Sequence, residues 1–256
     1  MKTKDKTKTE KIIFACDLDD TLIHSYKKRR ENDICIEWVE EREQSFIDRD
    51  IYDKIADISD EVIFVPITTR AIRQYKRIKW KDGKEPKYAV TTNGAVLLYG
   101  GEEDMKWRED SEKVRKNYEG EMKRIISLLQ EENNYRICRM VDDMFIFAYC
   151  NDGVDIEERV MYYSGKTKLY IAYHGRKIYI MPSEFNKGAA LVKLKEKFGA
   201  ERIIAAGDSG IDVSMLNEAD IAYCREKIKD EVKNGNKRVF SDERELINSV
   251  IDLIRR

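Results

Sequence analysis

The chain has 256 residues, of which 42% are hydrophobic and 38% are charged, so it is long enough to bury a sizeable core. Its 48 basic and 49 acidic residues give a formal net charge of -1, a balance that argues against a nucleic-acid partner. Because the sequence contains neither the apolar run of a signal peptide nor a stretch of membrane-spanning length, we expect a cytoplasmic protein with no membrane partner.

An apolar run at residues 11–16 predicts a buried parallel strand, which ends abruptly in Asp17-Leu18-Asp19-Asp20-Thr21. Pro66 cannot donate to a ladder, so strand pairing in the next apolar run should bulge or end there. The elements expected up to residue 99 are, in order, a hairpin at 34–39 and 44–47, a helix at 48–59, a strand at 62–67, a basic helix at 71–80, and short strands at 88–90 and 96–99.

Residues 99–182 show an α-β-β-α-β-β pattern. The first helix is the best supported, because its apolar residues recur at spacings of three and four and share one face. The expected elements are helices at 110–130 and 156–163 and strands at 135–141, 144–150, 169–174 and 177–181. This segment is expected to fold as a small unit inserted into a larger one.

After residue 186 the pattern returns to alternating helix and strand. A helix should end at Gly199, which is a favourable C-terminal cap, and strands are expected at 201–206 and 221–223. Asp242 and Glu245 mark the start of a last helix. The sequence therefore predicts an α/β fold with a doubly wound, mostly parallel sheet core at residues 1–98 and 183–256, and an inserted α+β cap at 99–182.

Polar residues follow three of the predicted core strands. Asp17 and Asp19 come after the first strand, Thr68 after the second and Asp208 after the strand at 201–206, while Lys187 opens a helix. Ligands of open α/β sheets bind at the carboxyl ends of the strands. We therefore expect these five side chains to meet at one site.

These residue types suit phosphoryl transfer. Phosphate-monoester hydrolysis is among the slowest uncatalysed reactions and needs acceleration of up to ~10²¹-fold, so it calls for covalent catalysis and strong charge compensation. Asp17 can attack phosphorus and divide one hard step into two. Asp19 can give a proton to the leaving oxygen and later accept one from water.

A cluster of four carboxylates, at Asp17, Asp19, Asp208 and Asp212, would repel strongly without a cation. Hard oxygen ligands predict a bound dication, most simply Mg²⁺. Lys187 would place a further positive charge between nucleophile and phosphate, and hydroxyl and amide groups of the loops would donate to the phosphoryl oxygens.

The motifs resemble those of the haloacid dehalogenase (HAD) superfamily of phosphatases. The segments that match its four motifs, in order, are Asp17-Leu18-Asp19-Asp20-Thr21, Thr68-Thr69-Arg70, Lys187-Gly188 and Gly207-Asp208-Ser209-Gly210-Ile211-Asp212. The α-β-β-α-β-β insert is similar to the cap of the Cof-type and sucrose-phosphatase-like branch. The resemblance covers nearly the whole chain.

The resemblance implies a role for each acidic residue. Asp17 would be nucleophile and metal ligand, and Asp19 would be the acid/base and bind the metal through its backbone carbonyl. Asp208 would be a metal ligand, and Asp212 a ligand or a group that supports one.

By the same resemblance, five residues would contact the substrate. Thr68, Thr69 and Lys187 would bind the phosphate, and Asn93 and Arg70 would lie at the rim of the substrate pocket. The chain departs from the branch in having Thr69 where Gly is usual. It also has Ile211 where Asn is usual, which removes an amide from the surroundings of Asp212.

The expected substrate is a small phosphorylated metabolite, a sugar phosphate by family resemblance, and the expected assembly is a monomer or small homo-oligomer. A phosphomutase would use the same aspartyl chemistry and return the phosphoryl group to a second hydroxyl. A non-catalytic alternative is a phospho-accepting signalling module or a metabolite-binding protein. Five cysteines without a CxxC pair indicate reduced thiols, which fits the cytoplasm.

Overall fold

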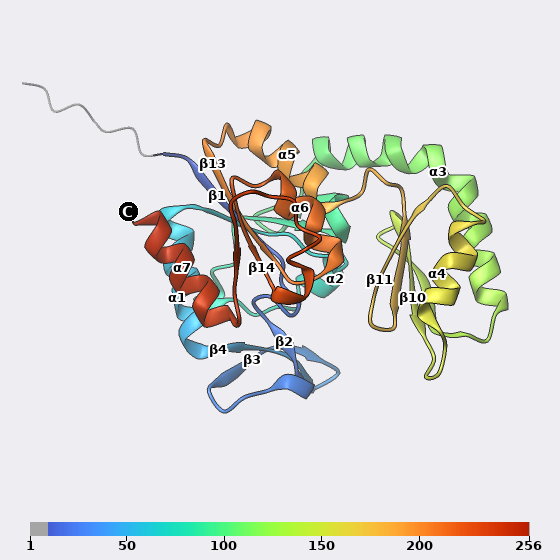
Figure 1. Cartoon of the computed structure of the whole chain (residues 1–256), viewed down its shortest axis with the longest axis horizontal. Helices are drawn as coiled ribbons and strands as arrows, with labels where there is room; N and C mark the ends of the chain where they lie inside the picture. Colours follow the sequence, from blue (N-terminus) through green and yellow to red (C-terminus); the bar gives the residue numbers. More distant parts are fainter. Residues whose placement is uncertain (1–9, 256) are drawn as a thin grey trace, which may run out of the picture.

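The computed structural model of the chain describes residues 10–255. Its larger part is built on a parallel sheet with helices on both sides, and a second sheet with two helices lies at the other end of the molecule (Figure 1). Between residues 10 and 255, no helix combines the length and the apolar character needed to cross a membrane. All five cysteines are free.

The central sheet has five parallel strands in the order β15-β14-β13-β1-β5. The strands are β1 (Ile12–Cys16), β5 (Ile63–Pro66), β13 (Arg202–Gly207), β14 (Ile221–Cys224) and β15 (Lys237–Val239). Cys16 at the end of β1 is level with Ala206 on one side and with Pro66 on the other. The loops that follow these three strands therefore start side by side.

Pairing of β5 with β1 ends at Pro66, as predicted. A single parallel bridge between Ile67 and Val90 then continues the sheet edge into a small antiparallel sheet of order β6-β7-β8. These strands are β6 (Tyr88–Thr91), β7 (Val96–Tyr99) and β8 (Glu102–Glu103).

Both faces of the central sheet are covered, which explains why β1 is apolar at every position. Phe14 and Cys16 pack in the cluster that contains the apolar residues of α1 (Arg49–Glu61) and α7 (Glu243–Ile254). Ile13 and Ala15 pack on the opposite side with α5 (Lys187–Phe198) and α6 (Val213–Glu218). The doubly wound core is thus confirmed.

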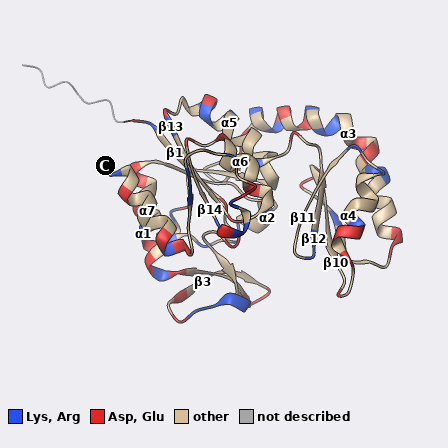
Figure 2. Cartoon of the chain, in the orientation of Figure 1, with Lys and Arg blue, Asp and Glu red and all other residues tan. Residues whose placement is uncertain are grey.

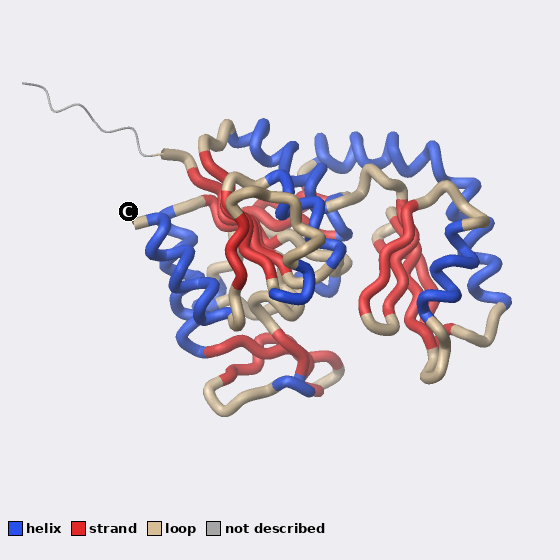
Figure 3. Tube along the Cα trace, viewed as in Figure 1, coloured by secondary structure: helices blue, strands red, loops and turns tan. Residues whose placement is uncertain are grey.

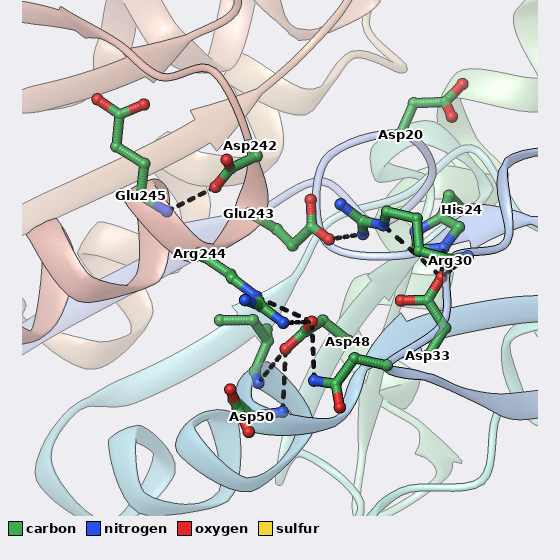
Figure 4. A network of polar contacts seen from close by, with 12 residues as sticks. Asp20, His24, Arg30, Asp33, Asp48, Asp50, Asp242, Glu243, Arg244 and Glu245 are labelled. Atoms are coloured by element: carbon green, nitrogen blue, oxygen red, sulfur yellow. Dashed lines mark hydrogen bonds and ion pairs between the residues drawn. The ribbon is translucent and has the colours of Figure 1, made fainter.

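A three-stranded antiparallel sheet of order β2-β4-β3 extends from the core. It is made of β2 (His24–Ser25), β3 (Asp33–Val39) and β4 (Arg42–Asp48). Figure 4 shows how this sheet is tied to α7: Arg244 donates through Nε and Nη2 to one oxygen of Asp48, at 2.9 and 2.5 Å. The other Asp48 oxygen caps α1 by accepting from the amides of Asp50 and Ile51.

The insert forms a four-stranded antiparallel sheet of order β11-β12-β10-β9. Its elements are α3 (Met105–Glu131), β9 (Tyr135–Val141), β10 (Phe145–Cys150), α4 (Ile156–Ser164), β11 (Tyr170–His174) and β12 (Lys177–Met181). Helices α3 and α4 cover the side of this sheet away from the core, and the other side is turned toward the core (Figure 3). The predicted order α-β-β-α-β-β is confirmed.

Helix α3 begins earlier than predicted, at Met105, because Asp104 caps it by accepting from the Trp107 amide at 2.9 Å. Trp107 packs in the core cluster around Ile13, whereas Met122, Ile125 and Leu129 pack in the insert. One helix therefore connects the two parts, and the division at residues 99 and 182 stays a proposal.

The helix predicted at 71–80 is wrong beyond its first turn, since α2 spans only Ile72–Tyr75. The Lys79 amide donates to the Ile36 carbonyl of β3, which draws the chain away from a helical path.

Strands β2, β8 and β15 and helix α6 were not predicted, because such short segments carry no recognisable periodicity. Short 3₁₀ turns complete the chain: η1 (Tyr26–Lys28), η2 (Lys81–Gly83), η3 (Thr92–Gly94), η4 (Gly210–Asp212) and η5 (Glu226–Ile228).

Candidate active site

Asp17 lies where β1 leaves the sheet. Its amide donates to the Ala206 carbonyl at 2.9 Å, so the backbone keeps its pairing with β13 for one residue beyond the strand. The residue is buried, with 6% of its surface exposed, and its Oδ2 accepts from the Thr21 hydroxyl at 3.3 Å. The carboxylate is thus held in one place by the loop that follows it.

Lys187, at the start of α5, lies between two carboxylates. Its Nζ is 2.5 Å from Asp17 Oδ1 and 2.6 Å from Asp212 Oδ1, and the residue is only 1% exposed. Although burial favours the neutral amine, the charges of Asp17 and Asp212 outweigh it and raise the pKa of Lys187. The lysine is therefore a fixed cation beside Asp17.

The remaining oxygen of Asp212 is held by the loop after β13. Oδ2 accepts from the amides of Asp208 and Ser209, at 3.1 and 2.9 Å, and from the Ser209 hydroxyl at 2.9 Å. The close approach requires Gly207, because a Cβ there would lie 2.4 Å from the Cβ of Asp212. Both oxygens of Asp212 are thus engaged in positioning Lys187 and the loop.

Asp208 completes the acidic cluster. Carboxylate oxygens of Asp17, Asp208 and Asp212 all lie within 4.8 Å of one another, and all three residues are buried. Burial and the neighbouring carboxylates raise the pKa of Asp17 even though Lys187 opposes the change, and burial and Asp212 raise the pKa of Asp208. Buried hard oxygen donors that repel one another fit a divalent ion such as Mg²⁺.

Asp19 is held by Arg70, which follows β5. Arg70 Nε and Nη2 each lie 2.8 Å from an oxygen of Asp19. Its Nη1 donates to Glu37 of β3 at 2.8 Å, and Arg77 donates to the other Glu37 oxygen at 2.9 Å. Ser45 of β4 donates to Glu37 at 2.5 Å and so completes this arrangement. Burial raises the pKa of Asp19, but the charge and hydrogen bonds of Arg70 outweigh it and the net shift is downward.

Of the other predicted substrate contacts, Thr69 lies at the site, whereas Thr68 and Asn93 are buried in the structure around it. Thr68 is fully buried, and its hydroxyl oxygen accepts from the Arg70 amide at 3.2 Å. Thr69 lines the cavity above Asp17. Asn93 is 2% exposed, and its Nδ2 donates to the Phe185 carbonyl at 2.8 Å, next to the end of the insert.

The cavity above Asp17 is shared between core and insert. Asp17, Asp19, Thr69, Lys187 and Asp208 line it from the core. The insert contributes three residues that the sequence had not singled out as site residues, and these are His174, Lys177 and Tyr179.

Ile211 also lines this cavity, and it packs against the cluster of insert residues that includes Phe145 and Tyr179. The position where the family usually has Asn is therefore an apolar contact between core and insert in this chain.

Fold, motifs and site geometry lead to one protein class. The chain belongs to the haloacid dehalogenase-like hydrolase family, whose sequence pattern matches residues 87–254. No curated protein matches the sequence closely enough to be informative.

Solved structures show the same fold. The sucrose-phosphatase of Synechocystis, in complex with sucrose and phosphate, has 13% identity and a TM-score of 0.64, with 96% of this chain and 98% of that chain covered. A phosphatase of the same superfamily from Bacteroides thetaiotaomicron has 15% identity and a TM-score of 0.61, with 96% of each chain covered. A trehalose-6-phosphate phosphatase related protein has 13% identity and a TM-score of 0.59, with 95% and 97% covered.

The predicted family and fold class are thus confirmed, and the family match shows that the chain is a hydrolase.

Proposed function

We propose that this protein is a Mg²⁺-dependent phosphatase that hydrolyses a small phosphorylated metabolite through an aspartyl-phosphate on Asp17. The observation that carries the proposal is the contact of Lys187 with both Asp17 and Asp212, beside Asp208. Asp208 pairs with Lys227 at 2.7 Å, so three buried carboxylates face two lysines at this site. The excess of buried negative charge fits a site that binds a cation and an electrophilic phosphoryl group.

In the first step an oxygen of Asp17 forms a bond to phosphorus while the bond from phosphorus to the leaving oxygen breaks. Lys187 holds Asp17 in a fixed orientation and offers positive charge to the phosphoryl oxygens. Asp19 gives its proton to the leaving oxygen. When bound to Asp17, Asp208 and the Asp19 carbonyl, Mg²⁺ would neutralise charge on the phosphoryl group.

In the second step water attacks the phosphorus atom, and the bond from phosphorus to the Asp17 oxygen breaks. Asp19 accepts a proton from this water, which returns Asp19 to its acid form and Asp17 to its carboxylate and releases inorganic phosphate. The ionised state of Asp19 that Arg70 favours suits this step directly.

Substrate choice is assigned to the insert, which we propose acts as a cap over the core. Its Lys177 and Tyr179 face the same cavity as Asp17, so they would contact the part of the substrate that leaves. A sugar phosphate fits a cavity with many polar groups. We further propose that the enzyme is a cytoplasmic monomer or small homo-oligomer.

The test is phosphate release from a panel of phosphorylated sugars, nucleotides and small acids, with and without Mg²⁺. We expect turnover with Mg²⁺ that is lost in Asp17→Asn and kept in Asp57→Asn, which makes the same change at α1, outside the site. Full activity in Asp17→Asn would reject the mechanism. Accumulation of a bisphosphate in place of free phosphate would favour a phosphomutase.

A further inference from the structure

The sheet of the insert has a free face that is turned toward the core, and its strand register places side chains on this face in rows. Arg139, Phe147, Tyr179 and Ala172 are direct cross-strand neighbours on β9, β10, β12 and β11. In the next row Tyr149 pairs with Lys177, and Lys177 pairs with His174. Side chains of a strand alternate between faces, so these rows share the side opposite α3 and α4.

This face closes a second cavity, of about 240 Å³, that continues the one above Asp17. Asp19, Thr69, Lys177 and Tyr179 line both cavities. The second cavity extends to Arg139 on the insert. Since pockets for drug-sized ligands have volumes of about 300–1,000 Å³, this smaller space suits the leaving group of a small metabolite.

The charges around this cavity do not balance. Its two carboxylates, Asp19 and Glu37, are bound by Arg70 and Arg77 of the core. The charge of Lys177 helps to lower the pKa of Asp19, but in the part of the chain that the structure describes no carboxylate forms an ion pair with Arg139 or Lys177 of the insert. The Arg139 guanidinium lies 5.7 Å from the centre of the Phe147 ring, and its Nη1 is 3.5 Å from the Met140 carbonyl.

On the helical side of the insert, by contrast, basic residues pair with carboxylates. Along α3 basic and acidic residues are interspersed (Figure 2), and Arg108, Arg115 and Lys123 each pair with a glutamate of the same helix. The two cations Arg139 and Lys177, by contrast, lie on the face turned toward the catalytic site. Two such cations on one wall of a substrate cavity favour an anionic ligand.

We propose that Arg139 and Lys177 form a subsite for a second acidic group of the substrate, so that the enzyme acts on phosphomonoesters that carry a further phosphate or carboxylate. The inference rests on the proposed function and refines its substrate class. A guanidinium recognises both phosphate and carboxylate through paired hydrogen bonds. Lys177 lies closer to the reacting phosphoryl group, because it also lines the cavity above Asp17.

The test compares matched pairs of substrates in the full chain with Mg²⁺. Glycerol phosphate is set against phosphoglycerate, which adds a carboxylate, and a hexose monophosphate against a hexose bisphosphate, which adds a phosphate. We expect kcat/KM to be at least about 10-fold higher for the diacid of one pair, and the pair identifies which acid is recognised.

In Arg139→Ala and Lys177→Ala, kcat/KM for the preferred diacid should fall about 10- to 100-fold, and far more than for its counterpart with the phosphate alone. Arg136→Ala is the matched control, because Arg136 is exposed on β9 and lies outside both cavities. A preference for the member of each pair that has a single acidic group, or an equal loss on both members in the variants, would overturn the subsite.

Equilibrium binding separates this proposal from the proposed function. Calorimetric titration of Asp17→Asn with the same four compounds measures binding without turnover. If the wild-type chain releases phosphate from no compound of the full panel, the proposed function fails, yet weaker diacid binding after addition of Arg139→Ala would still support the subsite. Equal affinity for the compounds with one and with two acidic groups would reject the subsite.

Discussion

The guanidinium of Arg70 binds both carboxylate oxygens of Asp19, through Nε and Nη2 at 2.8 Å each. This contact joins the candidate acid/base to the β3–β4 hairpin, since the same guanidinium donates to Glu37. It also keeps Asp19 ionised, because it lowers the pKa of that carboxyl against the effect of burial. Asp19 is therefore ready to act as a base, and it must gain a proton before it can act as an acid.

Removing Arg70 should move the pH profile of the enzyme. In Arg70→Ala the pKa of Asp19 rises, so the protonated form persists to higher pH and the alkaline limb of kcat shifts upward. The loss of positioning should lower kcat by up to about 10²-fold. Steady-state rates across pH measure both effects. Arg73→Ala, on α2 and outside the cavities at the site, should leave the profile in place, and an unmoved limb in Arg70→Ala would refute this role.

Mg²⁺ should stabilise the folded protein through Asp208. A ligand at 100 times its dissociation constant adds about 2.7 kcal/mol, and each kcal/mol corresponds to roughly 2–4 °C in Tm for a chain of this size. We expect a clear Mg²⁺-dependent rise in Tm for wild type and for Asp57→Asn, and a much smaller one for Asp208→Asn. Thermal unfolding with Mg²⁺ or a chelator measures it. An equal rise in Asp208→Asn would remove this residue from the ion site.

Two glycine substitutions should have different effects. Gly207→Ala should lower activity, and Gly120→Ala should raise stability. In Gly207→Ala the new Cβ would meet the Asp212 side chain at 2.4 Å, which displaces Asp212 and with it Lys187, so kcat should fall by about 10²-fold or more. Gly120 lies in α3, where an added Cβ would meet no other atom within 4 Å, so Gly120→Ala should stabilise the protein by about 1 kcal/mol. Urea unfolding and turnover of both variants test this, and a fully active Gly207→Ala would contradict it.

Asp48 should contribute to stability in a pH-dependent way. Burial raises the pKa of Asp48, but hydrogen bonds from Arg244, Asn32 and the start of α1 outweigh it, and the net shift is downward. The contribution of Asp48 to the free energy of unfolding is therefore complete above its ordinary pKa of about 3.9. This contribution is lost as pH falls through the pKa of Asp48 in the folded protein. Asp48→Ala should lower the free energy of unfolding by about 2 kcal/mol at pH 7.

Urea unfolding at several pH values measures this difference, which should shrink toward zero in acid. Asp50→Ala, at an exposed position of the same helix turn, should cost less than about 1 kcal/mol. A difference that is constant with pH would show that the charge of Asp48 is unimportant.

The central site was predictable because its signals are local. Each strand changes from apolar to acidic or hydroxyl residues within a few positions, as at Cys16 and Asp17, and the parallel register aligns those ends. Helix α5 was equally clear, since Asn186 caps its start and Gly199, directly after its last residue, adopts the left-handed conformation.

The contribution of the insert was not predictable in the same way. The alternation at Lys177, Ile178, Tyr179 and Ile180 shows which residues share a face, but nothing local shows that this face is turned toward Asp17. No local feature of the sequence marks His174, whereas the structure places its ring near carboxylates of Asp20 and Asp208. The pairing of Arg70 with Asp19 likewise depends on contacts between segments 51 residues apart.

The most direct test of the account is to trap the phosphorylated enzyme. Wild-type protein is mixed with Mg²⁺ and p-nitrophenyl phosphate, quenched in acid, reduced with borohydride and mapped by mass spectrometry. An acyl phosphate is reduced to an alcohol, so we predict homoserine at position 17 and an unchanged aspartate at position 19. Turnover without homoserine at position 17, or with homoserine at a different aspartate, would contradict the account.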